Sequence, residues 1–387
     1  MTDSNSPISD RWLDYFLRHG IQHEKFWNEY LKEGKKDILM VLGIGFDPRM
    51  CMGVDSILKA GGEGKRDVIA IEFHRYPSDI SHSEDLDNYT SQQNQKNENL
   101  KKIDKFIEAR GKKIIKNVQL FTSDGRIIGS RKSAEIIGID DIINYSDIII
   151  DISALPRYIY FPLIGKLLYI LDQNLLRGSI KYPNLFVIVA ENADIDRGIK
   201  DEEIEETANY MYGFASDLES EATENIPKIW IPILGEFQIR QLEKIFNLVN
   251  PEEICPILPS PSVNPRRGDD LLIEYRDFLF DRLNVEPRNI IYAAEQNPFE
   301  VYKQIIRTFK HYNEVLLPLG GCKVAISAVS SKLMSIGALL AAYELKNCGA
   351  SIGIANVETR EYGFDSSLNS TNNSVLFTLW LKGECYE

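Results

Sequence analysis

The sequence predicts an α/β protein made of two Rossmann-like parallel-sheet domains with an N-terminal helical prelude. Short apolar runs, which are typical of buried strands, alternate along the chain with longer segments of helical periodicity. The alternation pauses after "KIWIPILG" and then begins again, so each half of the chain carries its own series. Because parallel strands need a crossover between them, this alternation is typical of a parallel sheet covered by helices on both faces.

These patterns divide the chain into three segments. Residues 1–36 carry aromatic residues at helical spacing and are predicted to form the N-terminal helices. Residues 37–235 are predicted to form the first Rossmann-like domain, with an acidic insertion at about 194–226 that is either a solvated helix or a lid. Residues 236–387 are predicted to form the second domain, in which "NEVLLPLGG" is interpreted as a strand that ends at its glycine pair.

Composition and charge exclude several partners. The chain has 387 residues and a formal net charge of -13, with 44% hydrophobic and 26% charged residues, as in folded globular proteins. A negative charge of this size disfavours direct binding to duplex nucleic acid or to an anionic membrane surface. The most apolar stretch, "YIYFPLIGKLLYIL", contains Pro162 and Lys166 and is too short to span a bilayer.

Familiar catalytic and metal-binding motifs are missing from the sequence. The cysteines are scattered without a CxxC pair, and the histidines form no HExxH cluster, so no metal site is expected. Neither a Walker A sequence nor a GxSxG elbow is present, which argues against a P-loop NTPase and a serine hydrolase. With no signal-peptide pattern at its N-terminus, the chain is predicted to be cytoplasmic.

Polar residues follow each predicted strand of the first half. In open parallel sheets, ligands bind at the carboxyl ends of the strands, near the point where strand order reverses. The candidate site residues there are Gly43, Gly45, Asp47, Arg49, Glu72, Asp151, Ser153, Arg157 and Glu191. If the protein is an enzyme, Asp151, Glu72 or Glu191 would supply the general base or nucleophile.

The stretch "GIGFDPRM" resembles the start of a dinucleotide-binding fingerprint, in which glycines let the backbone approach a phosphate at a helix N-terminus. Glu72 follows at about the distance expected of an acid that accepts hydrogen bonds from ribose hydroxyls. However, Pro48 stands where the third glycine is expected. The stretch is therefore either a nucleotide-binding turn or a plain tight turn between strand and helix.

The stretch "DISALPR" carries an arginine that helix capping does not explain. Asp151 or Ser153 can cap the following helix, and Pro156 can begin it. A positive charge at Arg157 opposes the helix dipole, so we expect it to face an anion. That anion is either a ligand or a carboxylate such as Asp47 or Glu72.

The second half offers two further groups of candidate ligand-binding residues. The first group is Asn264, Arg266, Arg267 and Glu295, and the second is Ser330, Ser331 and Lys332. The paired arginines form either a phosphate or carboxylate clamp, or surface ion pairs with Asp269 and Asp270. The serines and the lysine would point hydroxyl and ammonium groups at an anion bound before a helix.

The stretch "AVSSKLMSIGALLAAYE" resembles the Gly-Thr/Ser-Lys-x-Met element of CARF and SAVED domains, which are Rossmann-like sensors of cyclic oligonucleotides. Lys332 and Met334 match its Lys-x-Met, while Ser331 stands at the Thr/Ser position and Ser330 replaces the glycine. The resemblance covers only this short stretch. It implies a nucleotide-sensing site in the C-terminal half.

Three functions fit these observations. The first is a nucleotide- or phosphate-binding sensor or accessory protein without chemistry of its own, in a bacterial signalling or antiviral defence system. The second is an enzyme acting on a nucleotide or related phosphate compound, such as a glycosidase, phosphodiesterase or transferase. The third is a scaffold that binds a protein partner through its acidic segment. For the first two, the expected ligand or cofactor is a small nucleotide-like molecule.

Overall fold

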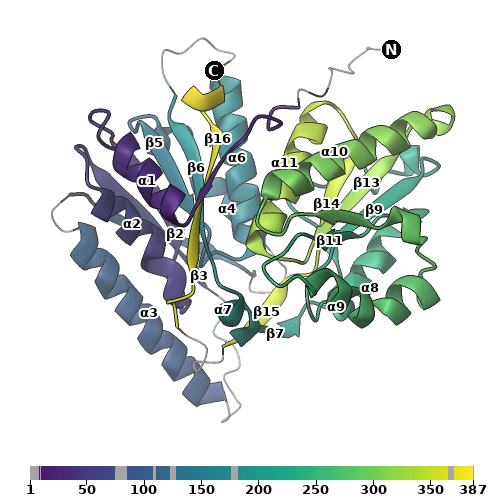
Figure 1. Cartoon of the computed structure of the whole chain (residues 1–387), viewed down its shortest axis with the longest axis horizontal. Helices are drawn as coiled ribbons and strands as arrows, with labels where there is room; N and C mark the ends of the chain where they lie inside the picture. Colours follow the sequence, from purple (N-terminus) through teal and green to yellow (C-terminus); the bar gives the residue numbers. More distant parts are fainter. Residues whose placement is uncertain are drawn as a thin grey trace. The chain divides into compact units, whose positions relative to one another are not determined.

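The computed structural model describes residues 8, 10–74, 85–107, 110–122, 128–175, 182–364 and 370–386. The chain forms two compact units (Figure 1). The first unit is Phe16–Glu202 with Glu361–Glu387, and the second unit is Met1–Tyr15 with Glu203–Arg360. Each unit contains a largely parallel sheet, which confirms the predicted α/β class with two such sheets.

The first unit has a mostly parallel sheet whose strand order reverses at its centre. Its strands lie in the order β1 (Phe16–His19), β16 (Val375–Lys382), β6 (Asn184–Glu191), β5 (Asp147–Asp151), β2 (Ile38–Gly43), β3 (Arg66–His74) and β4 (Lys113–Gln119). From β6 to β4 all neighbours are parallel, whereas β16 is antiparallel to both β6 and β1. Numbered along the chain, the parallel strands run 3-2-1-4-5, so the order reverses between β2 and β5.

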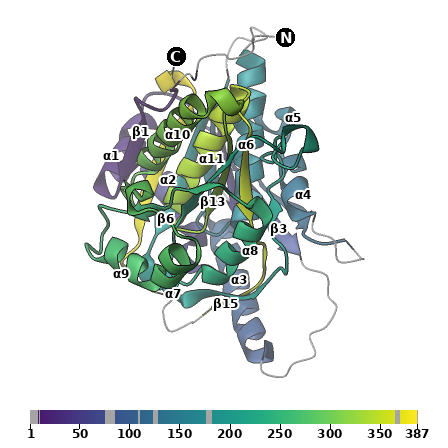
Figure 2. The same cartoon turned by 90° about the vertical axis from the view of Figure 1, so that its right-hand side faces the viewer.

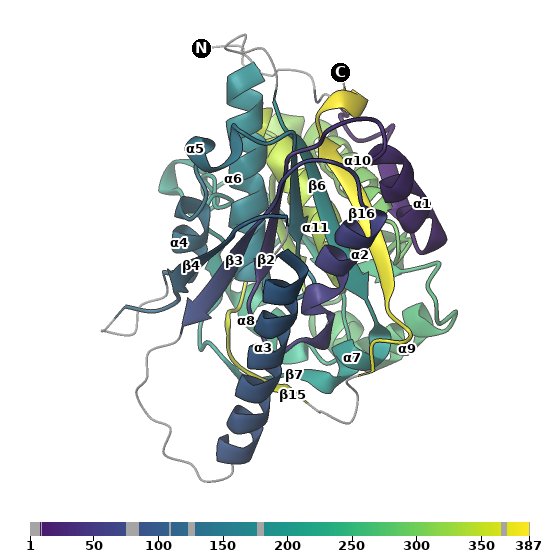
Figure 3. The same ribbon diagram turned by 90° about the vertical axis from the view of Figure 1, so that its left-hand side faces the viewer.

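Helices cover both faces of this sheet (Figure 3). Its helices are α1 (Ile21–Tyr30), α2 (Met52–Ala60), α3 (Asp85–Ile107), α4 (Gly129–Glu135), α5 (Ile139–Ile142), α6 (Arg157–Leu175) and α7 (Ala193–Gly198), with a 3-10 turn at Pro48–Cys51. Apolar residues of α1, α2 and α3, including Trp27 and Ile57, pack against β2, β3 and β6 in one core cluster. Helices α4 and α6 lie on the opposite face.

The second unit repeats the same strand order. Its strands lie in the order β12 (Ile291–Ala293), β11 (Ile257–Pro259), β9 (Lys228–Ile233), β13 (Lys323–Ala328), β14 (Ile352–Asn356) and β8 (Asn209–Tyr210), and β10 (Glu253–Ile254) also pairs with β9. All pairs are parallel except that of β8 with β14. The order is again 3-2-1-4-5, and it reverses between β9 and β13.

The helices of the second unit are α8 (Ile239–Val249), α9 (Arg267–Glu274), α10 (Pro298–Val315) and α11 (Lys332–Asn347) (Figure 2). Residues of α8 and α9, such as Leu242 and Leu271, pack with Trp230 of β9 in one core cluster. Helix α11 is buried along most of its length and packs closely on the start of α10. No helix in the described ranges is long and apolar enough to cross a membrane.

The chain passes between the units after Tyr15, after Glu202 and after Arg360. The later two crossings run through β7 (Ile199–Ile204) and β15 (Thr359–Phe364), which pair as a separate small sheet. The segment before the first crossing is anchored in the second unit. There Trp12 is fully buried against the ring of Tyr302, and the ring of Tyr15 stacks on that of Phe299 at 4.4 Å.

The unit boundaries differ from the predicted domain boundaries. Residues 1–36 do not form a separate helical segment, because Phe16–His19 is strand β1 and pairs with β16. A boundary at Gly235 is wrong because β9 lies inside the second sheet, between β11 and β13. Residues 236–387 also include β16, which returns to the first sheet. Apolar patterns predict a strand but carry no signal for which sheet it joins.

The acidic segment 194–226 is neither a long solvated helix nor a free lid. It contains α7, β7 and β8, and from Glu203 onward it belongs to the second unit. Met211, Phe214 and Leu218 are buried between its acidic residues. These apolar side chains bind the segment to the core despite its charge.

The stretch "NEVLLPLGG" is not a strand. Helix α10 extends to Val315, a 3-10 turn follows at Leu317–Leu319, and the strand begins at Lys323. Leu317 and Leu319 are exposed, so this apolar run is not a buried one. The glycine pair therefore lies before β13, at the sheet edge opposite to the one predicted.

Candidate ligand site

Both units have the same close packing where strand order reverses. A Cβ on Gly43, at the end of β2, would lie 2.6 Å from a side-chain atom of Leu155 in the loop after β5. A Cβ on Gly235, just after β9, would lie 2.1 Å from the carbonyl oxygen of Val329 in the loop after β13. Only glycine lets these loops approach so closely. We call these places the first and the second switch point.

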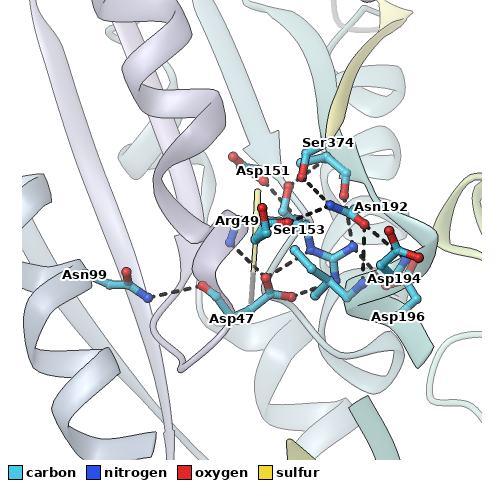
Figure 4. A network of polar contacts seen from close by, with 12 residues as sticks. Asp47, Arg49, Asn99, Asp151, Ser153, Asn192, Asp194, Asp196 and Ser374 are labelled. Atoms are coloured by element: carbon cyan, nitrogen blue, oxygen red, sulfur yellow. Dashed lines mark hydrogen bonds and ion pairs between the residues drawn. The ribbon is translucent and has the colours of Figure 1, made fainter. Parts of the chain in front are cut away.

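A buried ion-pair network fills the first switch point (Figure 4). The carboxylate of Asp47 accepts hydrogen bonds from the backbone N–H of Arg49 at 2.9 Å and from its guanidinium at 2.8 and 3.0 Å. The same guanidinium contacts Asp196 of α7 at 2.8 Å and donates to the carbonyl of Ala190 at 3.3 Å. Arg49 is only 1% exposed.

This network explains why the glycine turn is not an open phosphate cradle. The Asp47 carboxylate takes the position at the start of the 3-10 turn that a bound anion would otherwise occupy. Burial alone would lower the pKa of Arg49, but Asp47 and Asp196 raise it well above its ordinary value. Arg49 therefore stays charged and paired. Of the two interpretations of "GIGFDPRM", the geometry favours the structural turn.

Asp151 and Ser153 are buried beside this network. Asp151 is 3% exposed and accepts a hydrogen bond from the backbone N–H of Ser153 at 2.9 Å. The hydroxyl of Ser153 accepts one from the backbone N–H of Ala190 on β6, also at 2.9 Å. These contacts tie the end of β5 to its neighbour β6.

The remaining candidates of the first half lie on β3, on β6 and at the start of α6. Glu72 forms an ion pair with Lys96 of α3 at 2.6 Å, and it stands on β3, on the other side of β2 from Asp151. Glu191 ends β6, where it pairs with Val375 of β16. Arg157 is half-buried and begins α6.

Sequence reasoning missed two members of the network, Asn99 and Asp196, and it noted Asn192 only as a polar residue after a strand, not as a site residue. Asn99 is fully buried in α3 and donates to the carbonyls of Gly45 and Asp47 at 3.1 Å each. Asn192 caps α7 by accepting from two of its backbone N–H groups. Asn192 follows a strand and could have been chosen, whereas Asn99 lies inside a long polar helix and has no such signal.

The second switch point presents an exposed aromatic ring. Phe237, two residues after Gly235, is 84% exposed and has the left-handed backbone angle φ = 61°. Its backbone N–H donates to Glu274 of α9 at 2.7 Å. Tyr275 donates through its hydroxyl to the carbonyl of Gly235 at 2.6 Å and accepts from the N–H of Gln238 at 3.0 Å. Residues 235–238 are thus fastened to the end of α9.

The loop after β13 lies against this one and leads into α11. Ser331 caps the helix, since its hydroxyl accepts from the backbone N–H of Met334 at 3.3 Å. The hydroxyl of Ser330 lies 3.3 Å from the sulfur of Met334. Ser330, Ser331 and Lys332 are half-buried, so solvent reaches all three.

Arg267 joins two of the surrounding loops. Its guanidinium contacts Glu295, after β12, at 2.8 Å and Glu236, after β9, at 3.8 Å. Glu295 in turn accepts from the backbone N–H of Val263 at 3.2 Å. Arg267 of the predicted clamp is therefore held by Glu295 and Glu236. In the surface alternative, Asp269 and Asp270 were expected in their place.

Arg266 and Asn264 stand apart from this ion pair. The Arg266 side chain is 79% exposed and lies 3.9 Å from Asp270, a geometry that contributes little to stability. The side chain of Asn264 accepts a hydrogen bond from the backbone N–H of Arg266 at 3.1 Å. Both residues shape the loop after β11.

In the described part of the chain, no group of three or more His, Cys, Asp or Glu side chains is placed to hold a metal ion.

Comparisons with known proteins leave the family open. No family model matches the chain, and no curated protein matches it. Similar solved structures include a universal stress protein from Archaeoglobus fulgidus DSM 4304, with 9% identity, 84% of this chain and 97% of that chain covered, and a TM-score of 0.24. A putative universal stress protein from Pseudomonas aeruginosa UCBPP-PA14 has 13% identity, with 83% of this chain and 92% of that chain covered, and a TM-score of 0.21. TM-scores this low support no inference about function.

Proposed function

We propose that this protein binds a small nucleotide-like or phosphate-bearing ligand at the second switch point, as a sensor or accessory protein without chemistry of its own. One contrast carries the proposal. The first switch point is filled by the buried pair of Asp47 and Arg49, whereas solvent reaches Ser330, Ser331 and Lys332 at the second.

The groups at the second switch point suit an anion. Lys332 adds a positive charge at the first turn of α11, where the helix dipole also favours negative charge. Arg267, braced by Glu295 and Glu236, holds the neighbouring loops in place. A site whose loops are already positioned loses less conformational entropy when a ligand binds.

Two of the carboxylates proposed for catalysis, Glu72 and Asp151, do not support the enzyme alternative as a pair. Glu72 is paired with Lys96, and Asp151 is buried and hydrogen-bonded to the backbone of Ser153. They stand on strands separated by β2. For both carboxylates to act on one reacting atom, both would have to leave these contacts.

The resemblance of the Ser330–Met334 stretch to CARF and SAVED domains makes cyclic oligonucleotides the first ligands to test. A role in bacterial signalling or antiviral defence remains a prediction of that resemblance.

A thermal-shift screen tests the proposal. Wild-type protein is incubated with AMP, ATP, NAD, S-adenosylmethionine, cyclic dinucleotides, cyclic oligoadenylates and inorganic phosphate. A ligand at about a hundred times its Kd stabilises the folded state by roughly 2.7 kcal/mol.

The control variants locate the effect. We expect at least one nucleotide to raise the Tm of wild type, Lys332→Gln to lose that shift, and Arg288→Gln, an exposed arginine in the same unit, to keep it. If no compound shifts the Tm, or if Lys332→Gln responds like wild type, the proposal fails.

A further inference from the structure

We propose that Phe237 stacks on an aromatic ring of the ligand, so that the second switch point selects ligands carrying a nucleobase over simple phosphates. This inference rests on the proposed function and names the class of ligand that the site takes. It starts from the phenyl ring itself, which sequence reasoning did not single out.

The exposure of Phe237 is unusual for its residue type. A phenyl ring is normally buried, because removing it from water is favourable. Among the large apolar side chains in the described ranges, Phe237 at 84% is the most exposed, ahead of Val263 at 73%. A ring this exposed is available to stack on a flat partner.

The backbone of Phe237 is held in a conformation that a glycine would adopt more easily. A positive φ of 61° is strained for a residue with a Cβ. The bonds to Glu274 and Tyr275 secure this turn on both sides of the ring. At a position so exposed, packing does not require an aromatic residue. An exposed ring on a strained and hydrogen-bonded backbone therefore suggests a function for Phe237.

The ring stands within reach of the anion-binding groups. The backbone of Gly235 is in contact with Val329 and Ser330. Phe237 lies two residues beyond Gly235 and Lys332 two beyond Ser330, and each such step spans at most about 7 Å. One nucleotide can therefore place its phosphate at Lys332 and its base at Phe237.

The charges around the ring set the orientation of the ligand. Glu236 and Glu274 lie directly beside Phe237 in the loop and on α9, so a phosphate at the ring would meet carboxylates. A neutral base avoids this repulsion, and stacking on an aromatic face needs no counter-charge. We therefore expect the phosphate on the α11 side and the base on the α9 side.

Isothermal titration with matched ligands tests the inference. The probes are the nucleotide that gives the largest thermal shift, its ribose 5-phosphate core without the base, and inorganic phosphate. We expect the nucleotide to bind wild type at least about tenfold more tightly than ribose 5-phosphate, since stacking of a base contributes that much. Phe237→Ala should lose this preference, and Phe237→Trp should keep it.

Two controls separate stacking from folding. Phe237→Gly relieves the strained φ, so it should fold at least as well as wild type and still lose the preference for the base. Ile273→Ala removes another exposed apolar side chain, on α9, and should bind like wild type.

The outcomes distinguish this inference from the proposed function. If no nucleotide binds wild type, the proposed function fails first. If a nucleotide binds and Phe237→Gly binds it equally well, the stacking inference alone is overturned. Equal affinity of wild type for the nucleotide and ribose 5-phosphate would also overturn it.

Discussion

At the scale of single residues, burial separates structural from functional polar groups. Arg49 and Lys332 both follow parallel strands next to a reversal of strand order, and sequence patterns selected both. Arg49 is buried between two aspartates, whereas Lys332 remains accessible at the start of a helix. The sequence pattern finds polar residues at strand ends, but a partner such as Asp196, far along the chain, becomes apparent only in the fold.

Replacing Arg49 tests its structural role. Arg49→Met leaves the buried carboxylate of Asp47 without its cation and should lower the free energy of unfolding by roughly 3–5 kcal/mol. The double variant Asp47→Asn/Arg49→Met should recover part of this loss, because no buried charge is then stranded. Urea denaturation measures both. An Arg49→Met protein as stable as wild type would contradict the account.

The buried His23 predicts a pH dependence of stability. Its ring lies between the hydroxyls of Thr378 and Ser56, at 2.7 and 2.8 Å, and burial lowers its pKa from 6.5 to about 4. Between these values the unfolded chain binds a proton that the folded chain does not. The contribution of His23 to stability should therefore fall by up to roughly 3 kcal/mol as the pH drops from 6.5 to 4.

Denaturation at several pH values, compared between variants, tests this assignment. His23→Gln should remove this contribution and leave the slope of the remaining groups, although it costs stability at neutral pH. His19→Gln, at an exposed histidine of β1, should keep the wild-type slope. If the His23→Gln slope matches wild type, another group is responsible.

At the scale of elements, periodicity predicted the parallel strands well and their antiparallel neighbours poorly. The buried runs of β2, β5, β6 and β9 are continuous in apolar residues, as parallel strands covered on both faces require. Strand β1 was assigned to a helix because its aromatic neighbours recur at helical spacing, and the strand character of β16 was overlooked. Pairing with a distant strand overrides such local preferences.

Helix α11 depends on a glycine at its contact with α10. A Cβ on Gly337 would lie 2.2 Å from the carbonyl oxygen of Pro298, which is backbone and cannot move aside cheaply. Gly337→Ala should therefore destabilise the fold by roughly 1–3 kcal/mol, despite the higher helix propensity of alanine.

Gly268 in α9 is the matched control for Gly337. Its added Cβ would lie 3.4 Å from the carbonyl oxygen of Pro259, which is an ordinary contact distance. Gly268→Ala should leave stability unchanged or raise it by up to about 1 kcal/mol. Thermal or urea unfolding compares the two. Equal effects of both substitutions would contradict the packing argument.

At the scale of the whole molecule, two units share one strand order but use their switch points differently. The first has Asp47 and Arg49 after its opening strand, and the second has Glu236 and Phe237. Apart from one carboxylate in each, these residues have no chemistry in common, so the sequence shows little of the repeat beyond its alternating pattern. Strand order, which shows the repeat, depends on pairing between distant segments.

Glu358 makes the stability of the second unit sensitive to pH. It lies just before β15, and its carbonyl accepts from the backbone N–H of Glu205, just after β7. Burial, and then the charge of Glu205, raise the pKa of Glu358 from 4.5 to about 7. The folded chain thus keeps a proton that the unfolded chain releases, so stability from this group falls as the pH rises from 4.5 to 7.

Glu358→Gln should remove this fall and exceed wild type in stability above pH 7, by up to roughly 3 kcal/mol. Unfolding by urea at pH 5 and pH 8 measures the difference. The slopes from His23 and Glu358 oppose each other between pH 4.5 and 6.5, so each variant should expose the other group's slope. A Glu358→Gln profile parallel to wild type above pH 5 would refute the assignment.

The most direct test of the proposed ligand site is hydrogen exchange with and without the nucleotide found in the thermal-shift screen. We predict slower exchange at residues 235–238 and 329–334, around the second switch point, and unchanged exchange at residues 43–49 and 151–157. Protection confined to residues 43–49 and 151–157 would contradict the account, because the buried pair of Asp47 and Arg49 would then have to open for the ligand.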